Sequence, residues 1–118
     1  MTAGLVALCG GLGALARFAV DGLIEGRLLG AYPLGTLAVN LSGSFLLGVV
    51  VGLHASHRVA LLLGTATLGS YTTFSTWMLE SHRAAEDGET RIAWQSIVVA
   101  AALGLAVAAL GRALGRQL

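Results

Sequence analysis

Four apolar stretches divide this chain, and they constrain its fold more than any other feature. They run roughly over residues 3–20, 33–53, 59–79 and 92–111. A helix needs about 20 apolar residues to cross the hydrocarbon core of a bilayer. The last three stretches contain no lysine, arginine or aspartate. The pattern predicts an all-α membrane protein with four transmembrane helices, forming a single domain over residues 1–118.

The composition supports a membrane protein over a soluble one. Of the 118 residues, 56% are apolar and only 11% are charged. Soluble domains have about 25% charged residues, so a very apolar soluble bundle is the less favoured alternative. The net charge of +1 gives no reason to expect a nucleic-acid partner. Cys9 is the single cysteine, which excludes an internal disulfide and a cysteine metal cluster.

The third stretch contains a polar interruption, the glycine-led run GSYTTFST over residues 69–76. Lipid cannot hydrogen-bond a backbone, so non-helical main chain at bilayer depth persists only inside protein or beside water. Polar interruptions of this kind mark ion pathways and ion sites. We therefore expect a break in the third helix, with Gly69 permitting the unusual backbone geometry.

The arginines that orient the chain in a membrane are evenly divided between its two sides. The side with both termini has Arg58, Arg112 and Arg116, and the opposite side has Arg27, Arg83 and Arg91. Arg17 lies within the first stretch and contributes only weakly to the orientation of the chain. A balanced chain can insert in both directions, which predicts a dual-topology, antiparallel homodimer. The alternative is that one arginine outweighs the rest and fixes a single orientation.

Small residues recur every four positions on three of the predicted helices. These stripes are Ala3, Ala7 and Gly11; Ser44, Gly48 and Gly52; and Ala100, Gly104 and Ala108. Close approach of small residues drives helix association in lipid. Packing within one chain and packing between chains both remain open.

The polar side chains expected at depth are mainly hydrogen-bond donors. Thr36, Asn40 and Ser44 share one face of the second helix, and the third helix adds its hydroxyl run. Phe74 and Trp77 lie one turn apart, and aromatic ring edges are electropositive. Because Glu80 falls just outside the third stretch, no carboxylate is expected at depth. Donors without acids suit a small anion, although each polar residue taken alone has a purely structural explanation.

Three sequence blocks resemble the Fluc (CrcB) family of fluoride channels. They are GGLGALARF at 10–18, PLGTLAVNLSGSFLLG at 33–48 and GSYTTFSTW at 69–77. With its size and four predicted spans, the chain resembles this family over essentially its whole length. The resemblance implies a non-enzymatic, multi-pass channel in the plasma membrane of a prokaryote. It also implies an antiparallel dimer that exports fluoride passively around a structural Na⁺.

The resemblance also implies roles for individual residues. Asn40 is expected in the fluoride pore, with Phe74 as the first of two pore phenylalanines and Trp77 in the place of the second. Further expected pore residues are Thr36, Thr73 and Ser75, with Arg17 in the vestibule and the carbonyls of Gly69 and Thr72 on sodium. A fourth-helix tyrosine is missing, and Trp94 and Ser96 are the nearby candidates. These departures leave a heterodimer with a paralogous subunit open.

Three other functional classes fit the sequence less well. A proton-coupled exporter of the small multidrug resistance type needs a membrane-embedded carboxylate, and the first stretch has none. A scaffold without transport leaves the polar run unexplained. An enzyme is not expected, because no nucleophile, base and orienting group lie close together in the sequence.

Overall fold

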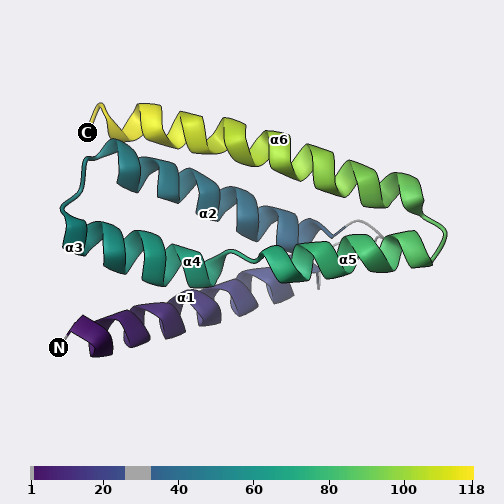
Figure 1. Cartoon of the computed structure of the whole chain (residues 1–118), viewed down its shortest axis with the longest axis horizontal. Helices are drawn as coiled ribbons and strands as arrows, with labels where there is room; N and C mark the ends of the chain where they lie inside the picture. Colours follow the sequence, from purple (N-terminus) through teal and green to yellow (C-terminus); the bar gives the residue numbers. More distant parts are fainter. Residues whose placement is uncertain (1, 26–32) are drawn as a thin grey trace.

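The computed structural model describes residues 2–25 and 33–118, and within these residues all regular secondary structure is helical (Figure 1). The long helices run antiparallel to their neighbours along the chain. The elements are α1 (Thr2–Glu25), α2 (Leu34–Gly52), α3 (His57–Val59), the π-helix η1 (Ala60–Leu68), α4 (Gly69–Tyr71), α5 (Phe74–Glu86) and α6 (Thr90–Gly115). The all-α prediction is confirmed.

Among the described residues, three helices are long and apolar enough to cross a membrane. They cover Thr2–Ile24, Leu34–Gly52 and Thr90–Gly115. The third predicted span is instead assembled from α3, η1, α4 and α5, so the expected break in this segment is present. The first and third apolar stretches end at residues 20 and 79, but the helices continue past Asp21 and Glu80, to Glu25 and Glu86. A charged residue ends an apolar window, but it does not end a helix.

Glycines bring the backbones of α2 and α6 into direct contact. A methyl group added at Gly48 would collide with the Ala108 carbonyl, and one at Gly111 would collide with the Phe45 carbonyl. The predicted small-residue stripe of α2 therefore packs within the chain. On α6 the contact includes Ala108 of the predicted stripe and continues toward the C-terminus, through Gly111 and Gly115.

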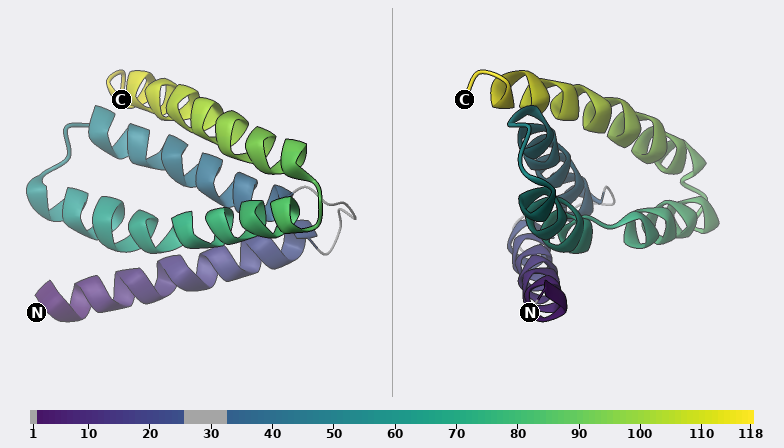
Figure 2. Two further views of the ribbon diagram at one scale, coloured as in Figure 1. Left: turned by 45° about the vertical axis from the view of Figure 1, so that its right-hand side comes forward. Right: turned by 60° about the vertical axis from the view of Figure 1, so that its left-hand side comes forward.

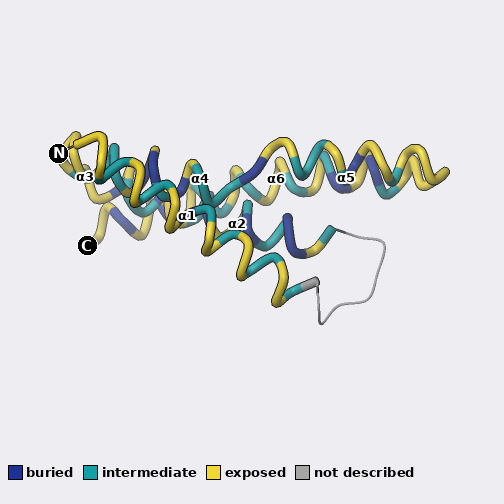
Figure 3. Tube along the Cα trace, turned by 90° about the horizontal axis from the view of Figure 1, so that it is seen from below, coloured by how far each residue is buried: buried dark blue, intermediate teal, exposed yellow. Residues whose placement is uncertain are grey.

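The predicted stripe on α1 has no such partner. Ala3, Ala7 and Gly11 are exposed, and no heavy atom of the described residues lies within 4 Å of a methyl group placed on Gly11. A different face of α1 packs against the interrupted segment, with Gly13 against the Thr67 carbonyl. In Figure 3, exposed positions recur along α1 itself. The stripe is left for lipid or a second chain.

Basic residues lie at both ends of the fold. The N-terminus, the α2–α3 connection and the C-terminus share one end, and the α5–α6 turn lies at the other (Figures 1 and 2). Arg58, Arg112 and Arg116 belong to the first end, and Arg83 and Arg91 flank the turn at the second. Arg27 falls outside the described residues. The described arginines follow the predicted division.

Candidate functional site

The break in the interrupted segment consists of two extended residues between α4 and α5. Thr72 has φ −77° and ψ 158°, and Thr73 has φ −145° and ψ 122°. Gly69, in contrast, is an ordinary helical residue with φ −63° and ψ −34°. The expectation that Gly69 provides unusual backbone geometry is therefore wrong, since any residue adopts these angles.

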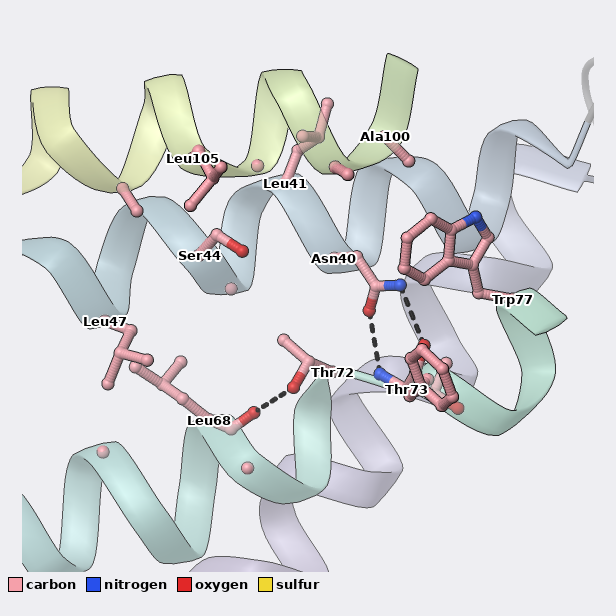
Figure 4. A pocket seen from close by; sticks show the side chains of 17 residues that line it. Asn40, Leu41, Ser44, Leu47, Leu68, Thr72, Thr73, Trp77, Ala100 and Leu105 are labelled. Atoms are coloured by element: carbon pink, nitrogen blue, oxygen red, sulfur yellow. Dashed lines mark hydrogen bonds between the residues drawn. The ribbon is translucent and has the colours of Figure 1, made fainter. Parts of the chain in front are cut away.

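Asn40, in the middle of α2, holds this break by two hydrogen bonds to one residue. Its Nδ2 donates to the Thr73 carbonyl, and its Oδ1 accepts from the Thr73 N–H, each at 2.8 Å (Figure 4). Thr73 is only 8% exposed, so water has little access to these groups. The amide side chain satisfies both backbone groups of an extended residue, which buried main chain requires.

Hydrogen bonds around the break also leave the two carbonyls that were predicted to bind sodium without their helical donors. In a continuous α-helix the N–H of Thr73 would bond the Gly69 carbonyl, and the N–H of Thr76 would bond the Thr72 carbonyl. Here Thr73 bonds Asn40 instead, and the Thr76 N–H bonds the Thr73 hydroxyl at 3.2 Å. Gly69 and Thr72 thus lose their helical donors at a cavity wall. Free carbonyl oxygens of this kind suit a hard cation.

A cavity of about 590 Å³ opens between α2, the interrupted segment and α6. Its walls are mostly aliphatic, and Asn40, Ser44, Thr72 and Thr73 add polar groups (Figure 4). An asparagine amide has two N–H groups. Since one of those on Asn40 bonds Thr73, the other remains as a donor at the cavity.

Phe74 and Trp77 form an aromatic pair on the wall of this cavity. Their ring centroids lie 5.8 Å apart with the planes at 89°, an edge-to-face arrangement. Phe74 is 69% exposed, whereas the Trp77 indole N–H donates to the Ser96 carbonyl at 3.3 Å. Trp77 therefore presents its ring to the cavity and not its N–H.

Ser96 also fixes α6 against α5. The Ser81 hydroxyl donates to the Trp77 carbonyl at 2.9 Å and lies 3.3 Å from the Ser96 hydroxyl. Both serines are buried, while Trp94 is exposed. Of the two fourth-helix candidates, Ser96 is the one that contacts the aromatic pair.

A second cavity, of about 320 Å³, lies on the other side of the break. Arg17 and Thr36, both predicted site residues, line it, and Thr73 lines both cavities. Ser75 is an exposed residue whose hydroxyl lies 3.5 Å from that of Thr73, and it is not among the residues lining either of these cavities. The full lining of the second cavity is Ala14, Arg17, Phe18, Asp21, Thr36, Val39, Thr73 and Thr76.

Carboxylates do lie among these polar groups, so the expectation that none lies at depth is wrong. The Thr36 hydroxyl, on a residue 2% exposed, donates to Glu80 Oε1 at 3.0 Å. Oδ1 of Asp21 is also buried. Sequence reasoning missed both acids, together with Thr76. Their spacing was the available signal, because Glu80 follows Thr76 and Asp21 follows Arg17 by one helical turn, which places each pair on one face.

Comparison with known proteins identifies close relatives. The family described as "CrcB-like protein, Camphor Resistance (CrcB)" matches residues 4–112. The chain is 52% identical over 111 residues to "Fluoride-specific ion channel FluC 2" of Mycolicibacterium paratuberculosis, covering 94% of this chain and 91% of the relative. It is 50% identical over 107 residues to a protein of the same name from Mycobacterium tuberculosis, covering 91% and 85%. It is 44% identical over 117 residues to "Fluoride-specific ion channel FluC 1" of Symbiobacterium thermophilum, covering 94% of each.

Proposed function

This chain belongs to the CrcB family, whose curated relatives are named fluoride-specific ion channels, and on that premise we propose that it is a passive fluoride channel. The prediction that the protein is not an enzyme is confirmed by this membership. In the proposed function, HF enters the cell from acidic surroundings and ionises inside. The channel, in the plasma membrane of a prokaryote, lets the trapped anion leave down its gradient and so lowers its toxicity.

The observation that carries the proposal is the Asn40–Thr73 pair at the broken segment. Fluoride is small and strongly hydrated, so a pore must replace its water with donors that release it again. Asn40 retains one amide N–H at the cavity, and the exposed ring of Phe74 lies on the same wall. These groups supply an amide donor and an electropositive ring edge without a fixed positive charge. Such a set binds an anion weakly enough for it to move on.

We propose that two copies assemble antiparallel, and the charge distribution supports this arrangement. All six acidic residues belong to the half of the fold toward the α5–α6 turn, and the opposite end has arginines without acids (Figure 1). The acids are Asp21, Glu25, Glu80, Glu86, Asp87 and Glu89. Antiparallel pairing sets the basic end of one copy beside the acidic half of the other, and complementary potentials favour that register. A paralogous subunit is the alternative partner.

Sodium is proposed as a structural ion and not as cargo. The carbonyls of Gly69 and Thr72, from each of two chains, would hold it where the breaks meet. Carbonyl dipoles offset the desolvation of a cation without a carboxylate. Bound there, the ion would stabilise the contact between the two interrupted segments.

Fluoride efflux from liposomes tests the proposal. Vesicles containing purified protein are loaded with potassium fluoride, valinomycin is added so that potassium balances the charge, and external fluoride is followed with an electrode. Fluoride is expected to leave down its gradient without an imposed proton gradient, while chloride-loaded vesicles of the same preparation retain their anion. Efflux that requires a proton gradient, or equal loss of chloride, would contradict the proposal.

A further inference from the structure

Two opposite charges share the second cavity without pairing. Arg17 and Asp21 lie one turn apart on α1, and both line the cavity. Among the described residues neither forms an ion pair within 4.0 Å, and Asp21 Oδ1 is buried without a hydrogen-bond partner. In a helix, a cation placed four residues before an anion is the less favourable order for pairing. The two side chains therefore line the same cavity without forming an ion pair.

The cavity gives the carboxylate of Asp21, a half-buried residue, room for water. Its 320 Å³ equals about ten water molecules at ~30 Å³ each. A buried charge without a protein partner is costly unless water solvates it, so this cavity should be water-filled. Both charges then act on anything that dissolves in this water.

The cavity lies beside the proposed fluoride path. Thr73 lines both cavities, so the break is the wall between the charged cavity and the cavity that contains Asn40 and Phe74. An anion that approaches the break from this side passes Arg17 and Asp21. An arginine alone would attract anions and also retain them, whereas conduction needs binding that is weak enough to release the ion.

We propose that Asp21 is a rate-determining residue of the channel that offsets Arg17 and keeps anion binding in this cavity weak. The inference rests on the proposed fluoride conduction. It predicts that loss of the Asp21 charge strengthens anion binding beside Arg17. The fluoride concentration that gives half-maximal flux should fall about three- to ten-fold in Asp21→Asn at low ionic strength. The maximal flux should not rise, because the anion is then released more slowly.

The test measures initial fluoride efflux against fluoride concentration in liposomes, for wild type and five variants. Asp21→Asn removes the charge with little change of shape, and Asp21→Glu retains it and should behave like wild type. Asp87→Asn is the matched control, because Asp87 is exposed, caps the C-terminus of α5 and is absent from the lining of both cavities. Arg17→Gln should raise the half-saturating concentration, and the double variant Arg17→Gln/Asp21→Asn should return it toward the wild-type value.

Added salt provides a further test, and the possible negative results distinguish failure of this inference from failure of the proposed function. A non-permeant salt at about 1 M shortens the Debye length to roughly 3 Å, so it should shrink the effect of Asp21→Asn. An unchanged or raised half-saturating concentration in Asp21→Asn, or an equal fall in Asp87→Asn, would overturn the inference while leaving fluoride conduction intact. Absence of flux in the wild type would instead remove the proposed function and this inference with it. If Asp21→Asn does not assemble, an Arg17→Gln channel with wild-type half-saturation overturns the inference on its own.

Discussion

Replacing Asn40 by alanine should release the backbone of the break between α4 and α5. The side chain makes two bonds of 2.8 Å to Thr73, a residue that is 8% exposed. A buried backbone group that loses its partner costs about 1–3 kcal/mol. With two groups released and some water entering the space of the missing amide, we expect a loss of about 2–4 kcal/mol in local stability.

Hydrogen exchange of the Thr73 amide measures this loss directly. Each 1.4 kcal/mol is a factor of ten, so protection of this amide should fall roughly 30- to 1,000-fold in Asn40→Ala. Ser42→Ala is the matched control on the same helix. The Ser42 hydroxyl lies 2.8 Å from the Tyr71 hydroxyl at an exposed position, so its loss should leave Thr73 protection nearly unchanged. Unchanged protection in purified Asn40→Ala would refute the argument that Asn40 holds the break.

Asn40→Asp separates the structural role from the proposed role in conduction. Aspartate retains the acceptor for the Thr73 N–H, but it loses the donor to the Thr73 carbonyl and faces the cavity with a negative charge. Thr73 protection should therefore fall less than in Asn40→Ala, yet fluoride efflux should be severely reduced with the assembly intact by size-exclusion chromatography. Wild-type efflux in Asn40→Asp would remove Asn40 from the anion path.

Three further outcomes follow from the aromatic pair, the free carbonyls and the balanced charges. Trp77→Phe removes the bond to Ser96 and a bulky ring, so liposome efflux should rise a few-fold at a stability cost of about 1 kcal/mol; reduced efflux would show that the indole is needed. Prolonged replacement of sodium by a large organic cation should abolish efflux and readdition should restore it, whereas full activity in sodium-free buffer would count against the ion. A C-terminal reporter should appear on both sides of the membrane and shift to one side when three lysines are appended; a reporter found on one side in the unmodified protein would contradict dual insertion.

The helices were predictable from the sequence because lipid imposes a simple rule on composition. Long apolar runs indicated α1, α2 and α6, with Arg17 the one charged residue inside them, and the hydroxyl run indicated that the third segment is broken. The ends of α1 and α5 were not predictable in the same way. The first and third apolar stretches end just before an acidic residue, whereas these helices continue past Asp21 and Glu80. Asp21 and Glu80 are consequently half-buried, although the sequence predicted no carboxylate among the polar residues at depth.

The cause of the break could not be read from the local sequence. Glycine at position 69 suggested a backbone origin, but Gly69 is helical, and the extended residues Thr72 and Thr73 are held by Asn40 from another helix. A bond between residues 33 positions apart has no sequence signature. The division of the small-residue stripes was equally hidden, since Gly11 and Gly48 have the same spacing pattern but only Gly48 packs within the described chain.

Fluoride selectivity in liposomes tests the central claim most directly. One preparation of purified protein is reconstituted, divided and loaded with either fluoride or chloride under the same potassium gradient. We predict rapid fluoride efflux that is driven by the gradient alone, with chloride retained at the level of protein-free vesicles. Retention of fluoride, or release of both anions at similar rates, would contradict the assignment of this protein as a passive fluoride channel.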